Sequence, residues 1–185
     1  FMLDGIVLAG GYSSRFNKNK MCVDYKGLPL IVHTILTMHE VCEKIYVVTG
    51  HYHDEIKEVL RNYDYVETVY NRDYALGMFS SVKAGVTRIN HNFFLIPGDY
   101  PLLGKEVYEK LLLGKEKLRV PSFEKHLGHP LYFDFSLKKE ILNTKATNLK
   151  AYRDLCGFEI IDVDDPFILK DIDTEEDFLG INGKE

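Results

Sequence analysis

The sequence predicts an α/β fold, a three-layer sandwich in which a mostly parallel sheet lies between two layers of helices. Short and almost uninterrupted apolar runs alternate with segments whose apolar residues recur at helical spacing. Parallel strands that are buried on both faces have this continuous hydrophobic pattern. The chain has 185 residues, 45% of them hydrophobic, and no low-complexity linker, so we expect residues 2–185 to form a single domain.

The first half of the chain contains four expected strands separated by three expected helices. The strands are rich in β-branched or aromatic residues, whereas the helices have apolar residues three or four positions apart. Pro29 precedes the first helix, and its fixed φ suits a helix start. In chain order we expect a strand at 5–9, a helix at 30–41, a strand at 44–49, a helix at 54–61, a strand at 65–70, a helix at 78–89 and a strand at 93–96.

The second half of the chain has a more mixed pattern. Strand-like pieces alternate with further helices, which continues the sandwich. The expected strands are 118–121, 129–133 and 158–163, and the expected helices are 104–113, 136–143 and 147–155. In the earlier helix at 78–89 we expect Met78, Val82 and Val86 to be core residues because they lie on one face.

Charge and composition exclude several classes of protein. Residues 162–185 carry a net charge of −7, which leaves +2 for the rest of the chain given −5 overall. A duplex-binding protein would be basic with a clustered Lys/Arg face, so we expect no nucleic-acid partner. No apolar run approaches the ~18 residues of a membrane helix, and the start of the chain has no basic leader. Cys22, Cys42 and Cys156 have no C-x-x-C spacing, so we expect a cytoplasmic protein without disulfides.

The fold places a ligand site at the carboxyl edge of the sheet, after the first and fourth strands. Gly10 and Gly11 follow the first strand and allow a ligand to approach the backbone closely. Backbone N–H groups in such a loop can cradle phosphate. The side chains that could add donors or positive charge are Ser13, Ser14, Arg15 and Lys20. The loop fits neither the Walker pattern nor the dinucleotide fingerprint, and an ordinary polar connection is the alternative.

A carboxylate follows the fourth strand at the same edge. Asp99 could hold Mg²⁺, which prefers one or two carboxylates together with phosphate oxygens. The alternative is a turn aspartate, because Gly-Asp-x-Pro also favours a turn. His51, His53 and Asp54 form a second polar group, which we interpret as a loop and helix start rather than a metal site because no third ligand cluster has zinc spacing.

Five segments in order resemble the nucleotidyltransferases that activate small phosphorylated molecules, most closely the molybdenum-cofactor cytidylyltransferases and guanylyltransferases. The likeness extends from about residue 4 to residue 178. The segments are Leu-Ala-Gly-Gly at 8–11 with Ser13, Arg15 and Lys20, Gly-Met-Phe-Ser-Ser-Val-Lys-Ala-Gly at 77–85, Gly-Asp-Tyr-Pro at 98–101, Gly-His-Pro at 128–130, and Asp-Ile-Asp-Thr-Glu-Glu-Asp-Phe at 171–178.

The resemblance implies a Rossmann-like sheet similar to that of nucleotide-diphospho-sugar transferases, and it implies roles for individual residues. Catalytic roles are implied for Arg15, Lys20 and Asp99, and metal binding for Asp99 and Asp173, with Mg²⁺ or Mn²⁺ as the ion. Nucleotide binding is implied for Leu8, Ala9, Gly10, Gly11, Ser13, Ser14, Arg15, Lys20, Gly77, Ser81 and Gly98, and acceptor binding for Ser80, Lys83 and His129.

Two of these implied roles have structural alternatives. Asp173 could instead cap the terminal helix, since acidic residues favour a helix N-terminus. We give Asp171 a weaker claim to the metal than Asp173. His129 could be satisfied by backbone hydrogen bonds at a strand edge, whereas the family likeness places it near the acceptor.

The implied reaction is transfer of CMP from CTP to the phosphate of molybdopterin, with release of pyrophosphate. The Gly10-Gly11 pair resembles the guanylyl branch, whereas the segments at 77–85 and 128–130 resemble the cytidylyl branch, so GTP is the alternative nucleotide. Phe16-Asn17 stands where the family has Met-Gly, and Glu175 stands where it has Pro. The same motifs are compatible with a different acceptor such as a sugar phosphate, and with a non-catalytic nucleotide-binding accessory protein. A molybdoenzyme or a chaperone is the expected transient partner.

Overall fold

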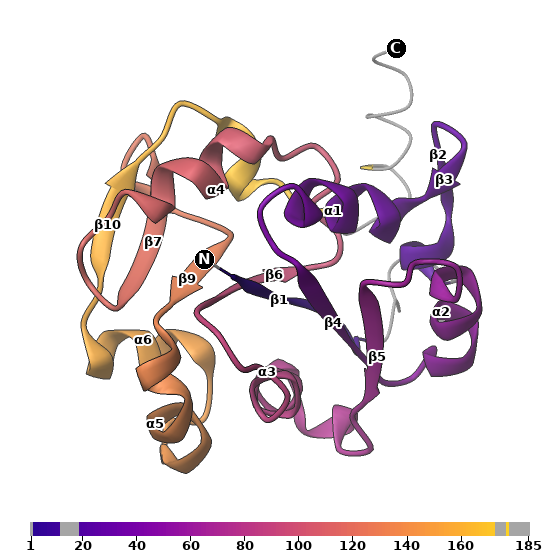
Figure 1. Cartoon of the computed structure of the whole chain (residues 1–185), viewed down its shortest axis with the longest axis horizontal. Helices are drawn as coiled ribbons and strands as arrows, with labels where there is room; N and C mark the ends of the chain where they lie inside the picture. Colours follow the sequence, from indigo (N-terminus) through magenta and orange to yellow (C-terminus); the bar gives the residue numbers. More distant parts are fainter. Residues whose placement is uncertain (1, 12–18, 173–176, 178–185) are drawn as a thin grey trace.

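The computed structural model describes residues 2–11, 19–172 and 177. An eight-stranded sheet runs through the molecule in the order β10-β7-β9-β6-β1-β4-β5, with β8 paired to β7 (Figure 1). A separate hairpin joins β2 to β3. The strands are β1 (Asp4–Ala9), β2 (Asp24–Tyr25), β3 (Leu28–Pro29), β4 (Lys44–Thr49), β5 (Val66–Tyr70), β6 (Phe93–Pro97), β7 (Leu118–Phe123), β8 (His126–Leu127), β9 (Leu131–Phe133) and β10 (Glu159–Asp162).

Parallel pairing dominates the sheet, as the sequence predicts. β1 lies between β4 and β6 and pairs in parallel with both, and β5 extends the sheet in parallel beyond β4. β9 is antiparallel to both of its neighbours, β6 and β7. β10 returns to a parallel pairing, with Ile160 opposite Val120. The carboxyl ends of β1, β4 and β6 therefore meet at one edge of the sheet.

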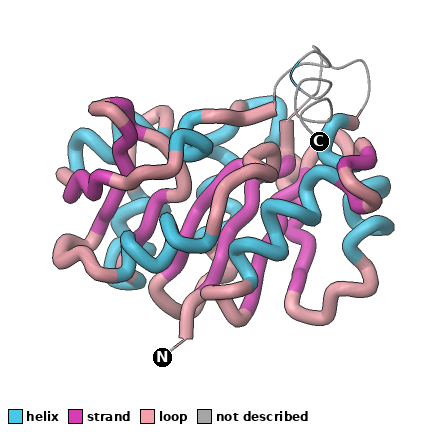
Figure 2. The backbone as a smooth tube through the Cα atoms, turned by 90° about the horizontal axis from the view of Figure 1, so that it is seen from above, coloured by secondary structure: helices cyan, strands magenta, loops and turns pink. Residues whose placement is uncertain are grey.

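Within the described residues, six α-helices cover the two faces of the sheet. α1, α2 and α4 pack on one face and α3, α5 and α6 on the other (Figure 1). Seen from above, helices cross in front of the strands (Figure 2). The helices are α1 (Leu30–His39), α2 (His53–Leu60), α3 (Met78–Val86), α4 (Lys105–Leu112), α5 (Lys138–Asn143) and α6 (Leu149–Cys156), with short 3-10 helices η1 (Lys20–Cys22), η2 (Tyr74–Leu76), η3 (Phe135–Leu137) and η4 (Pro166–Leu169).

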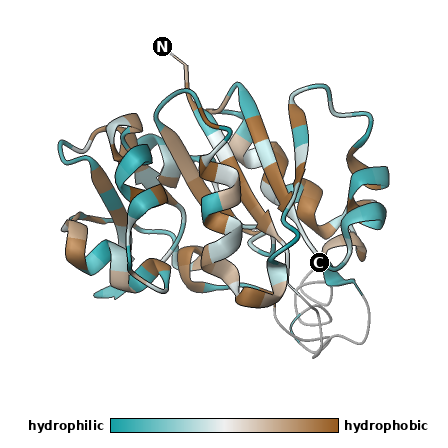
Figure 3. Ribbon diagram, turned by 90° about the horizontal axis from the view of Figure 1, so that it is seen from below, coloured by the Kyte–Doolittle hydropathy of each residue, from teal (hydrophilic) through white to brown (hydrophobic). Residues whose placement is uncertain are grey.

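The hydrophobic core is divided between the two faces by the alternation along each strand. Val7 and Ala9 of β1 pack in the layer of α1, whereas Ile6 and Leu8 pack in the layer of α3. Every residue of β1 is buried. Seen from below, apolar residues run along the central strands while polar residues lie on the outer surfaces (Figure 3). This two-sided burial confirms the three-layer α/β prediction.

The expected elements lie close to the observed ones, with two kinds of difference. The helices starting at Leu30 and Met78 end earlier than the apolar spacing predicts, at His39 and Val86. The hairpin of β2 and β3 and the short strand β8 were not expected, since two-residue strands carry no recognisable periodicity. Within the described ranges, we find no helix with the length and apolar character needed to cross a membrane.

Candidate functional site

A pocket of about 410 Å³ opens at the edge of the sheet where β1 and β6 end. The first residues of α3 and of η1 close two of its sides. The N-terminus of α3 lies at this pocket, and a helix N-terminus carries a partial positive charge that favours an anion. The pocket is lined by Leu8, Gly10, Gly11, Lys20, Met21, Tyr74, Gly77, Met78, Ser81, Pro97, Asp99 and Asp171.

Many of the residues predicted from the sequence meet in this pocket. Those of the predicted set that line it are Leu8, Gly10, Gly11, Lys20, Gly77, Ser81 and Asp99. Ala9 is buried in the core beside them, and Gly98 lies between two lining residues. Ser13, Ser14, Arg15 and Asp173 lie outside the described residues, as do Phe16 and Asn17.

Lys20 and Asp99 form an ion pair inside the pocket. The Nζ atom of Lys20 donates to Oδ2 of Asp99 at 2.9 Å, and both side chains are largely buried. The other carboxylate oxygen, Oδ1, is buried and has no hydrogen-bond partner among the described residues. Burial raises the pKa of Asp99, while the adjacent ammonium of Lys20 lowers it and the charge of Asp171 raises it.

The backbone around Asp99 is fixed by three hydrogen bonds from different elements. The N–H of Gly98 donates to Leu8 at 2.9 Å, which ties β6 to β1. The hydroxyl of Thr34, on α1, donates to the carbonyl of Gly98 at 2.8 Å. The N–H of Ile172 donates to the carbonyl of Asp99 at 2.9 Å. This last bond places Asp171 at the pocket, although the sequence favours Asp173 over it.

Glycine at position 10 allows the end of β1 to lie against the start of α3. A Cβ atom on Gly10 would lie 2.8 Å from Oγ of Ser81. Ser81 is buried and accepts a hydrogen bond of 3.0 Å from Nδ2 of Asn71. Gly77, just before α3, has a φ of 108°, a conformation that favours glycine. The Gly-Met-Phe-Ser-Ser segment is thus a turn and helix start that closes the pocket.

Gly50 is a packing point that sequence reasoning missed. It follows β4, and a Cβ atom there would lie 2.6 Å from both the carbonyl oxygen of Gly10 and Cβ of Tyr74. Tyr74 lines the pocket. The absence of a side chain at Gly50 therefore lets Tyr74 and the Gly10-Gly11 segment approach each other. Only the tertiary contact identifies this role, because a glycine directly after a strand is also common where the chain simply turns.

The three residues predicted to bind the acceptor lie outside the pocket lining as the described residues define it. The hydroxyl of Ser80 accepts a hydrogen bond from Nδ2 of Asn71 at 2.9 Å. The ammonium of Lys83 donates to the carbonyl of Thr144 at 3.3 Å. The backbone N–H of His129 donates to Ile168 at 3.0 Å. The contacts of Ser80 and Lys83 join α3 to neighbouring loops.

His129 combines a backbone role with an unpartnered ring nitrogen. Its Nδ1 is buried without a hydrogen-bond partner among the described residues, and its ring meets the ring of Tyr100 edge-on at 5.1 Å. Burial lowers the pKa of His129 to about 4, and the positive charge of Arg153 acts in the same direction. The imidazole is therefore neutral at pH 7. Tyr100 directly follows Asp99, so His129 lies one side chain behind the pocket.

Two expectations about other residues have different outcomes. Val82 and Val86 are fully buried, as predicted, but the prediction of Met78 as a core residue is wrong. Met78 is 57% exposed and lines the pocket, because it is the first residue of α3 and precedes the face that packs on the sheet. Nδ1 of His53 lies 2.6 Å from the hydroxyl of Thr49, in agreement with a structural role.

The pocket has the chemistry to hold a hard cation together with phosphate. In the described part of the chain there is no group of three or more His, Cys, Asp or Glu side chains that could hold a metal by themselves. Mg²⁺, however, commonly binds through one or two carboxylates and phosphate oxygens of the substrate. The unpartnered Oδ1 of Asp99 and the nearby Asp171 fit that donor set.

Comparisons with known proteins identify relatives along nearly the whole chain. The family described as MobA-like NTP transferase domain matches residues 5–157. The molybdenum cofactor cytidylyltransferase of Escherichia coli is 28% identical over 96% of this chain and 94% of that protein. A probable molybdenum cofactor guanylyltransferase of Thermococcus sibiricus is 30% identical over 71% of this chain and 68% of that protein. A nucleotidyl transferase structure from Methanothermobacter thermautotroptrophicus superposes with a TM-score of 0.84 at 20% identity, covering 99% of this chain and 97% of that one.

Proposed function

Since the chain belongs to the family of MobA-like NTP transferase domains and is a nucleotidyltransferase, we propose that it transfers CMP from CTP to the phosphate of molybdopterin with release of pyrophosphate. The observation that carries this proposal is the pocket in which Lys20 and Asp99 meet the glycine segment after β1. The near full-length likeness to a cytidylyltransferase supports CTP as the donor. The guanylyltransferase relatives and the Gly10-Gly11 pair favour GTP as the second candidate.

In this reaction the protein positions phosphates and neutralises their charge. A phosphate oxygen of the acceptor attacks the α-phosphorus of the nucleotide, and the bond from that phosphorus to the pyrophosphate breaks. The acceptor phosphate is already ionised at neutral pH, so no general base is needed. Phosphoryl-type transfer depends mainly on alignment and electrostatic stabilisation.

The proposed site residues would divide this work among them. Lys20 would bind the triphosphate, and the backbone from Gly10 to Gly11 would cradle it. Asp99 would hold Mg²⁺ or Mn²⁺, which supplies positive charge to the reacting phosphates when bound. Arg15 and Asp173 would add a second cation and a second carboxylate, as the family likeness implies.

We propose that the acceptor approaches from the side of β9, where His129 lies behind Tyr100. Ser80 and Lys83 would need to exchange their contacts within the fold for contacts to the acceptor. We further propose that residues 2–185 act as one nucleotidyltransferase domain. Support comes from β10 and Ile172, which follow the family match of 5–157 yet join the same sheet and the same pocket wall.

Thermal stabilisation by nucleotides tests the proposal directly. A ligand that binds only the folded state raises the melting temperature, by an amount that grows with the logarithm of its concentration relative to its dissociation constant. With Mg²⁺ present we expect CTP to stabilise the protein and ATP, UTP and GTP to have little effect. Stabilisation by GTP alone would instead indicate transfer of GMP from GTP. Stabilisation by none of the four nucleotides would contradict the proposed nucleotide site.

Pyrophosphate release then tests the chemistry. We expect release that depends on both the stabilising nucleotide and molybdopterin, and a loss on the order of a hundredfold in Asp99→Asn. A sugar phosphate that replaced molybdopterin would identify a different acceptor. Nucleotide binding without any pyrophosphate release would instead favour a non-catalytic accessory protein.

A further inference from the structure

We propose that Lys20 is an internal substitute for the divalent cation: its ammonium holds Asp99 before the substrate arrives, and it moves to the nucleotide phosphates when a metal takes that carboxylate. The inference rests on the proposed function and concerns the order in which the same site is assembled. It makes Lys20 a competitor of the metal for Asp99 as well as a ligand of the triphosphate.

The geometry of the ion pair makes the two cations mutually exclusive at one oxygen. Nζ of Lys20 lies 2.9 Å from Oδ2 of Asp99, and the side chains are 12% and 9% exposed. A magnesium ion binds carboxylate oxygen at about 2.0–2.1 Å and brings bound water with it. An ammonium at its present distance would overlap that hydration and repel the ion. A metal that coordinates both oxygens of Asp99, the unpartnered Oδ1 and the paired Oδ2, must therefore displace Lys20.

The other oxygen of Asp99 shows that one ammonium does not satisfy this carboxylate. Oδ1 is buried and has no hydrogen-bond partner among the described residues. A buried acceptor without a donor raises the free energy of the fold. A divalent cation, with several coordination positions and twice the charge, can satisfy this carboxylate more fully than Lys20 does.

Charge balance in the pocket points in the same direction. Asp99 and Asp171 contribute two negative charges and Lys20 one positive charge among the described lining residues. Asp171 is held in place by its neighbour: the N–H of Ile172 donates to the carbonyl of Asp99 at 2.9 Å, and the Ile172 side chain is fully buried against Tyr25 and Leu30. The backbone beside the second carboxylate is thus fixed at the pocket wall, and the described lining residues leave one negative charge unbalanced.

The displaced ammonium stays inside the pocket, where the triphosphate is expected. Lys20 begins η1 and lines the same pocket as Gly10 and Gly11, which would cradle the phosphates. A metal that binds alone removes Lys20 from Asp99 and gives its ammonium no phosphate in exchange. The metal–triphosphate complex provides both partners at once. Metal and nucleotide should therefore each bind better when the other is present.

The inference predicts opposite effects of one substitution on two affinities. In Lys20→Gln we expect Mn²⁺ alone, measured by calorimetry and by the electron paramagnetic resonance of free Mn²⁺, to bind about tenfold more tightly than in the unaltered protein. The affinity for CTP with Mg²⁺ should fall about tenfold in the same variant. Lys20→Met, which keeps most of the apolar stem, should behave in the same way if Lys20→Gln folds poorly.

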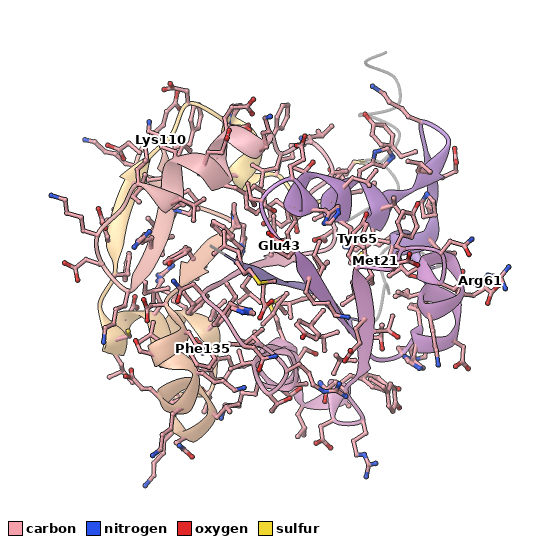
Figure 4. All side chains as sticks on the ribbon, in the orientation of Figure 1. Met21, Glu43, Arg61, Tyr65, Lys110 and Phe135 are labelled. Atoms are coloured by element: carbon pink, nitrogen blue, oxygen red, sulfur yellow. The ribbon has the colours of Figure 1, made fainter. Side chains whose placement is uncertain are left out.

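Lys110→Gln is the matched control because it also removes one positive charge. Lys110 projects from α4 and lies outside the lining of this pocket (Figure 4). We expect its affinities for Mn²⁺ and for the nucleotide to remain unchanged. Equal tightening of Mn²⁺ binding in Lys110→Gln and Lys20→Gln would reduce the effect to net charge and overturn the inference.

Asp99→Asn separates a failure of this inference from a failure of the proposed function. We expect it to weaken Mn²⁺ binding about tenfold or more, with or without Lys20. If Asp99→Asn binds Mn²⁺ as the unaltered protein does, the assignment of Asp99 to the metal is wrong. If Asp99→Asn loses Mn²⁺ but Lys20→Gln binds it no more tightly than before, the metal site stands and the exchange of Lys20 is refuted.

Discussion

The contact at Gly50 leads to a prediction about a residue outside the pocket lining. Gly50→Ala should reduce nucleotide binding and turnover, because the added Cβ would lie 2.6 Å from the carbonyl oxygen of Gly10 and 2.6 Å from Cβ of Tyr74. Ordinary contacts of a Cβ begin near 3.4 Å, so Gly10 or Tyr74 must retreat by roughly 0.8 Å. Neither atom is the end of a flexible side chain.

The size of both effects follows from that displacement. Overpacking of this kind costs about 1–3 kcal/mol of stability, which lowers the melting temperature of a chain of this length by about 2–12 °C. A misplacement of about 1 Å at a reactive centre can cost on the order of a hundredfold in rate. We therefore expect kcat/KM of Gly50→Ala to fall about 10- to 100-fold, with a raised dissociation constant for the nucleotide.

The control is a glycine on β1 at the other end of the strand. A Cβ on Gly5 would collide with the thioether of Met38, a flexible side chain far from the pocket. Gly5→Ala should lose stability in the same range and keep its kcat/KM. Pyrophosphate release at a temperature where both variants are folded compares them. Equal activity in the two variants would refute the reasoning that Gly50 sets the approach of Tyr74 to the glycine segment.

Three further predictions concern stability, each measured by urea unfolding. Tyr108→Phe removes a buried hydroxyl that has no hydrogen-bond partner among the described residues. The free energy of unfolding should therefore stay constant or rise by up to about 1 kcal/mol, and a decrease of more than about 1 kcal/mol would show that the hydroxyl has a partner. The pKa of His129 is about 4 in the fold and about 6.5 in the unfolded chain, so the unfolded chain binds the proton more readily as the pH falls below about 6.5. The free energy of unfolding should therefore decrease by about 2 kcal/mol from pH 7 to about pH 4.5. His129→Phe should make this dependence on pH less steep. Arg119→Met should lower the free energy of unfolding by about 2–3 kcal/mol, because the buried guanidinium donates to carbonyls at the end of α4. The control Arg61→Met, at an exposed arginine, should change it by less than about 0.5 kcal/mol. Similar losses in the two variants would contradict the structural role of Arg119.

Local sequence pattern is sufficient to predict most of the sheet and its helices. Strands such as β1 and β4 are buried on both faces, and that environment selects the continuous apolar runs that predict them. The direction of β9 was not predictable, because a three-residue apolar strand has the same pattern in either orientation. The hairpin of β2 and β3 depends on Lys26 and Gly27, whose positive φ angles leave only a weak signal in the sequence.

The pocket could be predicted only in part for a related reason. Gly10, Lys20 and Asp99 have residue types and positions after strands that indicate phosphate and metal chemistry without knowledge of their neighbours. The contributions of Gly50 and Asn71 arise from what packs against them, and such contacts join segments far apart in the chain. Helical spacing assigns Met78 to the core because it does not show which turn of α3 extends beyond the sheet.

The hydrogen bond from Ile172 to Asp99 has a consequence for the synthesis of the chain. A ribosome delivers Lys20 and Asp99 early, whereas the residue that fixes the carbonyl of Asp99 and fills the space between Tyr25 and Leu30 follows only after β10. A growing chain therefore has the phosphate-binding segment before the pocket wall that carries Asp171. Substrate recognition therefore matures only after residue 172 has been synthesised, and a chain truncated after η4 would contain every strand of the described sheet with an unfinished pocket.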